Sequence, residues 1–562
     1  MVTSLSLDAT SLVAFRVGLA TAVLLDLWER ASELEIWLTD DGVLPCDVRR
    51  RYLRNTWFTT LHCVDGTSTG QAALLLLAAV CAATLLVGRC CRLTSALVWL
   101  LTTSLHARNP LALHGGDVLL RLLLFWSMFV PLGAPPQPPV ATCGSAALVL
   151  QVVLMYACAA ATKSGGAWWG ECSAVHDALQ LDLLVTPLGE TLRRWAPPPL
   201  LCAATYATLL VEWAAPLLLV CPWRTAAARG VAVAVLVPLH ACFGLCLRLR
   251  LFPLVSVVAL LPFVPGAVWS RAPAAARAAA RRTLASGAAP TPALPSWLAA
   301  PPLLLLLPLV WQRHAPHVLG TRGAHGYAGL GGYGAWRGPA LVESAAQLLF
   351  LDQVWDMFAP QPVREDVWLI AAAERADGSV VDALSGAPPE WAKPARLSER
   401  FRSAAWLQYT MNLASDAVRP QPHWELFDAL SEALCRGTAS VPSPSPSPSP
   451  SPPSPLLMLE IYVAREVSPT VAEWRHREPA PLPEASLLYT YWCGSGGGSG
   501  EGGRDDSEGV EPAEESAAAG AGDGVCEDGG EKQCTRAGSG SDGAMTREQE
   551  LAAQSLLRSL FN

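Results

Sequence analysis

The chain has 562 residues, of which 51% are hydrophobic and only 16% are charged. Soluble proteins carry about 25% charged residues, so this composition argues against an ordinary soluble enzyme and excludes a chain that is disordered throughout. The net charge of −8 is unevenly placed, because residues 494–562 hold fourteen acids and five bases. The acidity therefore belongs to a tail, and the lack of a basic patch in the sequence argues against a nucleic-acid partner.

Long apolar runs follow one another through the first 311 residues. A helix needs about 20 apolar residues to cross a bilayer, with a range of about 17–25. Eight or nine runs meet or approach this length, namely 11–28, 70–88, 93–105, 117–132, 145–162, 199–221, 230–247, 251–269 and 295–311. The sequence therefore predicts an all-α polytopic bundle over residues 10–312, in a multi-pass integral membrane protein whose partner is the lipid bilayer. Lys and Arg are spread too evenly over the loops to orient the bundle.

The composition after residue 312 is that of a soluble protein. We interpret 313–344 as a Gly-rich linker and 345–493 as a small α+β soluble domain, with strands at 366–370, 380–384 and 456–463 and a helix at 397–412. A Ser-Pro repeat at 443–455 is typical of a polyproline-type spacer, here inserted within the domain. We expect the acidic tail at 494–562 to be disordered, with a short amphipathic helix at 545–561.

Most of the sixteen cysteines lie in or beside the apolar runs, where cysteine behaves as a small hydrophobe. Cys46 and Cys63 share the first loop and can pair if that loop is extracytoplasmic, which the sequence does not decide. His240, Cys242 and Cys246 have the residue types of a metal site. On a helix, however, His240 points about 200° away from Cys242, so we expect no metal there.

Ionisable residues within the runs cost free energy at bilayer depth and therefore need a structural or functional reason. Asp117 follows two glycines at the start of a helix, and we interpret it as the helix N-cap and as the ion-pair partner of Arg121 four residues later. Glu212 and His240 either bond across helices or serve a functional site.

Lys163 differs from the other basic residues for a compositional reason. The chain has 40 basic residues but only three lysines, Lys163, Lys393 and Lys532. Arginine stays charged, whereas a lysine amine in apolar surroundings can give up its proton. We therefore expect Lys163 to act as a base at the end of its span. The glycines that follow would bring Trp168 and Trp169 against a flat ligand such as a quinone ring. The alternative is an interfacial cation at a helix end.

Residues 155–163, Met-Tyr-Ala-Cys-Ala-Ala-Ala-Thr-Lys, are followed by Ser-Gly-Gly-Ala-Trp-Trp-Gly at 164–170. This segment resembles the one that carries the catalytic lysine of vitamin K-dependent γ-glutamyl carboxylases, and equally the bacterial proteins that share their horizontally transferred transmembrane (HTTM) domain. The resemblance covers roughly residues 10–493. Further matches keep the family's order: Asp-Asp-Gly-Val-Leu-Pro at 40–45, Leu-Val-Gly at 86–88 with Arg92, Asn109 with Gly-Gly-Asp at 115–117, Glu212, His240 with Phe252-Pro253, and Trp-Asp-Met-Phe-Ala-Pro at 355–360, here named the 355–360 box.

The resemblance implies a reaction. Lys163 would deprotonate vitamin K hydroquinone, whose anion reacts with oxygen to give a strong base. That base removes a γ-proton from a glutamate side chain, and carbon dioxide then adds to the carbanion. His240, Glu212 and Asp117 would complete the catalytic set. Two features depart from the carboxylase, since Asp117 stands where it has a functional histidine, and the large luminal domain is replaced by a smaller one.

The sequence thus leaves two hypotheses. The first is a quinone-dependent, carboxylase-type membrane enzyme that acts on a peptide or small-molecule substrate and uses no metal. The alternative is a non-enzymatic HTTM protein, either transporter-like or with a role in peptide maturation or immunity. The enzyme requires the amine of Lys163, whereas a transporter requires the charges of Asp26, Asp117 and Glu212.

Overall fold

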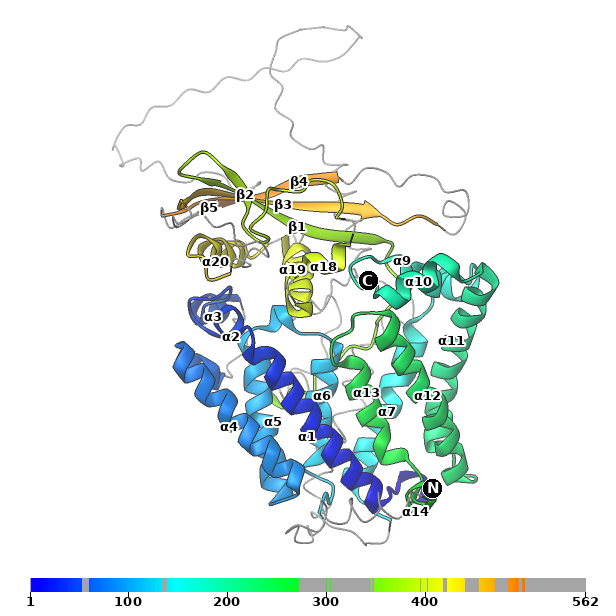
Figure 1. The fold of residues 1–562 in the computed structure, drawn as a ribbon. Coiled ribbons are helices and arrows are strands. Elements are labelled where there is room, and N and C mark those ends of the chain that lie inside the picture. Colours follow the sequence, from blue (N-terminus) through cyan, green and yellow to red (C-terminus); the bar gives the residue numbers. More distant parts are fainter. Residues whose placement is uncertain are drawn as a thin grey trace, which may run out of the picture.

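The computed structural model describes residues 2–52, 60–133, 139–271, 348–394, 396–401, 403–417, 422–439, 454–470, 484–494 and 498–500, with a few isolated positions between them. Over these residues the chain is mostly helical and carries a small antiparallel sheet toward its C-terminal part. Figure 1 shows the sheet lying across one end of a helical bundle, with a layer of short helices between the two.

Five helices are long and apolar enough to cross a membrane, and each coincides with a predicted span: α1 (Ala9–Ala31), α4 (Ser68–Val87), α7 (Cys143–Thr162), α11 (Pro198–Val220) and α12 (Thr225–Cys246). Their ends follow capping chemistry. The side chain of Asp8 accepts the backbone N–H groups of Thr10 and Ser11 at the start of α1. Helix α4 ends at Gly88, whose φ of +83° suits glycine and whose missing Cβ leaves room for the guanidinium of Arg16.

The predicted eight or nine spans are not confirmed. The other runs fold as shorter or more polar helices, and the run at 295–311 lies almost entirely outside the described residues. Helix α5 has eighteen residues but carries many polar side chains, α6 has only thirteen residues, and α13 continues into a 3-10 turn, η4. Their bounds are Cys91–Arg108 for α5, Gly115–Ser127 for α6, Phe252–Leu260 for α13 and Leu261–Phe263 for η4.

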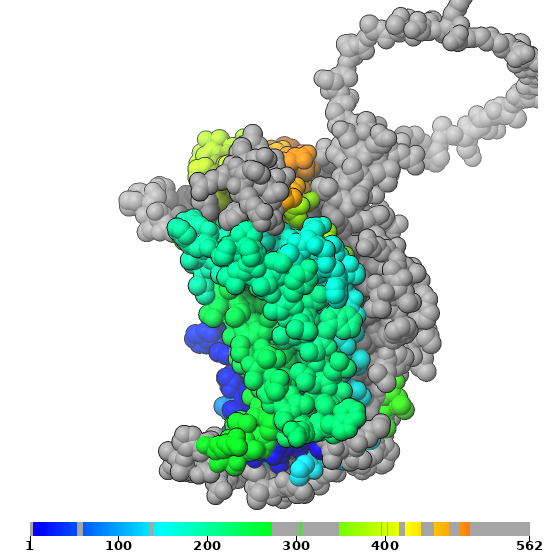
Figure 2. Space-filling model, turned by 90° about the vertical axis from the view of Figure 1, so that its right-hand side faces the viewer, coloured from blue at the N-terminus to red at the C-terminus, as the bar shows by residue number. Residues whose placement is uncertain are grey.

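Short helices connect these elements at the two ends of the bundle. They are η1 (Val2–Leu5), α2 (Leu34–Leu38), α3 (Cys46–Tyr52), η2 (Leu61–Cys63), η3 (Pro110–Ala112), α8 (Gly166–Trp169), α9 (Ala174–Gln180), α10 (Pro187–Trp195) and α14 (Gly266–Arg271). The outer faces of the long helices are apolar and exposed, as for Leu76 on α4 (66%) and Leu210 and Leu217 on α11 (70% and 73%). Figure 2 looks onto the face formed by α11 and α12. Exposed apolar rows of this kind are compatible with contact to a lipid bilayer.

The sheet has five strands in the order β2-β1-β3-β4-β5, and all neighbours are antiparallel. The strands predicted at 366–370, 380–384 and 456–463 fall on β1, β2 and β3, but β4 was not predicted. The predicted helix at 397–412 is two helices, α18 and α19, because the backbone of Phe401 is extended. The bounds are β1 (Glu365–Arg375), β2 (Val380–Asp382), α18 (Leu397–Arg400), α19 (Ala404–Ala417), α20 (Trp424–Cys435), β3 (Leu456–Val467), β4 (Glu484–Trp492) and β5 (Gly498–Gly500).

The Gly-rich linker at 313–344 and the acidic tail after residue 500 lie outside the described residues, as does nearly all of the Ser-Pro repeat. The predictions for these segments stay predictions. The chain order does place the repeat between α20 and β3, in a connection between two elements of one folded unit.

Aromatic contacts join the sheet layer to the bundle. The ring of Trp37 in α2 lies 4.8 Å from that of Trp406 and 5.4 Å from that of Tyr409, both on α19. The amide of Asn412 donates to the carbonyl of Leu111 at 2.7 Å. These contacts fix α19 against the end of the bundle, so the two parts share one apolar core.

The 355–360 box packs directly on the segment that follows α7. Trp355 is only 1% exposed, and its carbonyl accepts the hydroxyl of Thr162 at 3.2 Å. The backbone N–H of Gly165 donates to the carbonyl of Pro360 at 2.8 Å, and the indole of Trp168 donates to that of Phe358 at 2.9 Å. The 355–360 box is therefore ordered and docks on the bundle.

We expect Trp355→Ala to destabilise the protein by about 3–5 kcal/mol, because it removes a fully buried indole and leaves a cavity at this junction. Trp391→Ala is the matched control, since Trp391 is 47% exposed on the sheet side. Thermal unfolding of the detergent-solubilised full chain should show the loss for the first variant alone. Equal, small effects of the two substitutions would contradict the docking.

Candidate functional site

Lys163 ends helix α7 and points back into the bundle. Its side chain is only 4% exposed, and Nζ lies 2.8 Å from Oε2 of Glu212 on α11. Nζ also donates to the carbonyl of Ala159 at 3.0 Å and lies 5.3 Å from the centroid of the Trp168 ring. A buried carboxylate, a carbonyl and an aromatic face therefore surround the amine, which is not the environment of an interfacial cation.

Helices α7 and α11 position this ion pair. Pro216 lies one turn after Glu212 and has no N–H, so the carbonyl of Glu212 lacks its usual helical donor. An apolar bundle penalises either charge alone, whereas the paired groups compensate each other. The pair therefore joins the C-terminal end of α7 to the middle of α11.

Tyr156 and His240 form a second polar contact between neighbouring helices. The hydroxyl of Tyr156 lies 2.7 Å from Nε2 of His240 on α12, and both side chains are buried. Tyr156 precedes Lys163 by seven residues, which is two helical turns, so both project from one face of α7. Nδ1 of His240 has no hydrogen-bond partner among the described residues.

The 355–360 box covers this region from the sheet side and adds a carboxyl group, Asp356. Burial raises the pKa of Asp356 to about 6, and the nearby Lys163 ammonium opposes that rise. The two tryptophans that the sequence predicts beside a flat ligand lie in different surroundings. Trp168 is buried with Lys163 over its ring, whereas Trp169 is 54% exposed and donates its indole N–H to the Lys163 carbonyl at 2.7 Å.

A cavity of about 130 Å³ lies between the bundle and the sheet layer, and Asp356 is part of its wall. Its walls are mostly apolar, with Arg248, Arg250, His114 and two glutamines among them. Arg248 donates only one long bond, to the carbonyl of Ser398 at 3.4 Å, among the bonds to described residues. The cavity thus combines an apolar lining with cationic groups, which suits a ligand that carries an acid.

His114 is a hydrogen-bond donor in this wall. Its Nδ1 accepts the backbone N–H of Gly116 at 2.8 Å, so the proton of the neutral ring is on Nε2. Burial lowers the pKa of His114 to about 4, which keeps the ring neutral at pH 7. Nε2 has no hydrogen-bond partner among the described residues.

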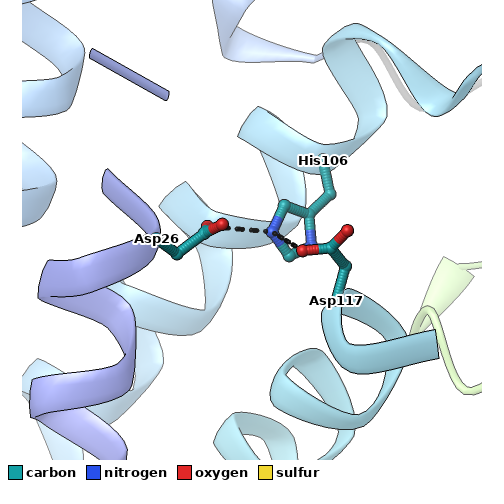
Figure 3. A group of neighbouring side chains, drawn as sticks. All are labelled: Asp26, His106 and Asp117. Carbon is teal, nitrogen blue, oxygen red and sulfur yellow. Dashed lines mark hydrogen bonds and ion pairs between the residues drawn. The ribbon is translucent and has the colours of Figure 1, made fainter. Parts of the chain in front are cut away.

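Asp117 does not join the Lys163 group but lies in a separate charged cluster. Figure 3 shows Asp26 of α1, His106 of α5 and Asp117 of α6 pointing toward one another. Nε2 of His106 lies 3.2 Å from Asp26 Oδ2 and 3.7 Å from Asp117 Oδ1. Arg30 bridges the two carboxylates, with Nε 2.9 Å from Asp26 and Nη2 2.8 Å from Asp117.

The three side chains of this cluster have ligand types and spacings that a metal ion could use. Arg30 already supplies a positive charge to both carboxylates, and Arg250 approaches the second oxygen of Asp117 at 3.7 Å. A divalent ion would have to sit beside two guanidinium groups. We therefore interpret the cluster as a buried ion network.

Two sequence interpretations of Asp117 are wrong. His114, not Asp117, is the N-cap of α6, and Asp117 is the third helical residue of a capping box whose carboxylate accepts the His114 N–H at 2.9 Å. The carboxylate pairs with Arg30 from another helix, while the Arg121 guanidinium lies 5.7 Å from the centroid of the Phe350 ring. The interhelical pairing is favoured because the single guanidinium of Arg30 contacts two buried carboxylates at once.

Comparison of the chain with protein-family models, with curated proteins and with solved structures finds no match in any of the three. The site is therefore argued from its own geometry. Sequence reasoning missed Tyr156, His114, His106 and Arg30. Tyr156 was detectable from its seven-residue spacing to Lys163, and Arg30 from its four-residue spacing to Asp26. The position of His114 in the cavity wall has no local signal.

Proposed function

We propose that the chain is a multi-pass membrane enzyme of the HTTM and vitamin K-dependent carboxylase type, with Lys163 as its base. The observation that carries this proposal is the buried pair of Lys163 and Glu212 beneath the 355–360 box. Paired ionisable groups buried inside an apolar bundle are a common sign of proton-transfer chemistry. His114 further supports the resemblance, since it places a histidine at the start of α6.

The pair can exchange a proton internally. When the ammonium passes one proton across the 2.8 Å contact to Glu212, the amine gains a lone pair and the site loses both charges. An apolar environment disfavours separated charges and so favours that neutral form relative to water. The amine can then take a proton from a bound acid, while the carbonyl of Ala159 and the ring of Trp168 hold it in place.

A hydroquinone is the cofactor that this proposal implies, and it would supply an acidic ring hydroxyl together with reducing power. The residues fit such a ring at His240, whose buried Nδ1 has no partner in the described part of the chain and can bond a ring oxygen. Trp168 is less suited to stack on the ring than the sequence suggested, because its face already receives the ammonium. Its proposed role is to position Lys163.

The cavity beside Asp356 is the proposed substrate chamber. Arg248 and the Nε2–H of His114 are donors suited to a carboxylate, and the apolar walls suit the methylene groups of a glutamate side chain. Asp356 lies in the wall of this chamber and also within the electrostatic reach of Lys163. We infer that Asp356 forms the boundary between the two parts of the site.

The distribution of cysteines supports an orientation. Six of the described cysteines at the sheet end are bonded, as Cys46–Cys63, Cys172–Cys202 and Cys435–Cys493, whereas Cys246 at the end of α12 is free. Those near the opposite end of the bundle are free, namely Cys90, Cys91, Cys143 and Cys221. Disulfides persist in oxidising compartments and thiols in reducing ones. We therefore propose that the sheet faces an extracytoplasmic compartment and the opposite end the cytoplasm.

A non-enzymatic, transporter-like role is the second candidate, and the buried Asp26–His106–Asp117 cluster favours it. Charged residues inside a bundle also mark ion and proton pathways. This role would require the cluster and leave Lys163 dispensable, whereas the enzyme requires Lys163.

We expect Lys163→Arg to abolish activity, because it keeps the cation but removes the ability to lose a proton at neutral pH. Mass spectrometry of γ-carboxylated glutamate in cells that express each variant is the measurement. The expected loss is about 10²–10⁴-fold, the usual contribution of a general base. Lys393→Arg is the matched control and should retain the signal, since Lys393 serves Asp182, Asp366 and Glu466 on the sheet side. Full activity of Lys163→Arg would refute the base.

The orientation has its own test in sealed membrane vesicles of known sidedness. A membrane-impermeant maleimide should label the exposed thiol of Cys90 only from the cytoplasmic face. After reduction, the same reagent should label Cys435 and Cys493 only from the opposite face. Labelling of Cys90 and of reduced Cys435 from one face would contradict the proposed topology.

A further inference from the structure

One face of α5 carries buried polar atoms that have no hydrogen-bond partners among the described residues. They belong to Ser95, Trp99, Thr102, His106 and Asn109, and the unpartnered atoms are Oγ, Nε1, Oγ1, Nδ1 and both amide atoms respectively. The spacing of four, three, four and three residues places all five within one narrow stripe of the helix. Four of the five side chains are at most 3% exposed, and Trp99 is partly buried.

The stripe differs from Thr94 and Ser104 of the same helix, whereas Thr103, which lies off the stripe, also has a buried hydroxyl without a partner among the described residues. A buried helical serine or threonine ordinarily donates to the carbonyl one turn earlier, as Thr94 does to Cys90 at 3.2 Å. Ser104 also has partners, since its Oγ bonds Thr60 at 2.8 Å and the N–H of Leu61 at 2.7 Å. The stripe atoms named above make no such hydrogen bond with the described residues. Buried polar atoms are nearly always bonded to protein or to ordered water, so a continuous row without protein partners points to water.

The stripe ends at the charged cluster. From Ser95 to His106 it extends about 16 Å along the helix, and Ser95 lies one turn from the α5 end that is opposite the sheet. At the other end, His106 contacts Asp26 and Asp117 through Nε2, while its Nδ1 belongs to the stripe.

The charged cluster can accept a proton. When His106 is neutral, the cluster has one more acid than it has arginines and therefore carries a net negative charge. The charged and titratable groups around the imidazole are Glu29, Asp26 and Arg30 on α1, Asp117 on α6, and the neighbouring His114, Arg250, His62 and Arg108; Arg108 is paired with Asp40.

We propose that this face of α5 lines a water-filled path by which protons reach His106 and its two carboxylates from the bundle end opposite the sheet. The proton moves along hydroxyl groups and waters to Nδ1 of His106, and Nε2–H then donates to Asp26 or Asp117. The path goes beyond the proposed enzymatic function and does not rest on it. It also explains why α5 is more polar than the five long helices.

Hydroxyl-radical footprinting of the full chain in lipid nanodiscs tests the path, because radiolysis generates radicals from water beside the side chain. Trp126 is the dry reference, since it is fully buried on α6 and its indole donates to Gln151 at 3.2 Å. Trp99 and His106 should be oxidised at least about tenfold faster than Trp126 if waters lie along the stripe. Rates as low as that of Trp126 would overturn the proposal.

Two variants add a matched comparison. Thr102→Val removes one hydroxyl from the stripe without changing its shape, whereas Leu101→Val changes a buried residue on another face of the same turn. The first should lower His106 oxidation at least about threefold by interrupting the waters, and the second should leave it unchanged. Equal effects of the two substitutions would also overturn the path.

Discussion

A charge inside an apolar bundle must find its counter-charge within the protein, and this constraint organises the structure around two buried networks. Lys163 and Glu212 join α7 to α11, while Arg30 joins α1 to α6 through Asp26 and Asp117. Removing one partner of such a network leaves an uncompensated charge, which typically costs about 3–5 kcal/mol. The Arg30 network lies at the sheet end of the bundle, next to the cavity that His114 and Arg250 line.

The sheet layer covers the end of the bundle and encloses the cavity beside these networks. The 355–360 box closes over the segment after α7, and α19 docks on α2 through Trp37. Asp356 thereby reaches the cavity from one side, while His114 and Arg250 reach it from the side of Asp117. The proposed amine base, acid-binding chamber and route for protons are the parts that proton-transfer chemistry on an acidic substrate requires.

The long helices were predictable because their apolar runs are continuous and their caps are local. Composition alone singled out Lys163 as an unusual residue of the bundle, because lysine is rare in this chain. The contacts between helices could not be predicted from the sequence. Asp117 has an ideal local partner in Arg121 four residues away, yet it pairs with Arg30, eighty-seven residues earlier. Likewise α5 looked like a shortened span, because a sequence window averages its polar stripe with its apolar faces.

Glu212 holds the Lys163 amine inside the bundle through their 2.8 Å ion pair. Because the chain has only three lysines, ¹⁵N-lysine labelling gives an NMR spectrum in which each side-chain nitrogen can be assigned by single substitutions. We expect the Nζ signal of Lys163 to differ from that of a solvated lysine and to shift on Glu212→Gln, while the signal of Lys393 stays in place. A solvent-like Lys163 signal that does not change in the Glu212→Gln variant would show that Glu212 does not hold the amine inside the bundle.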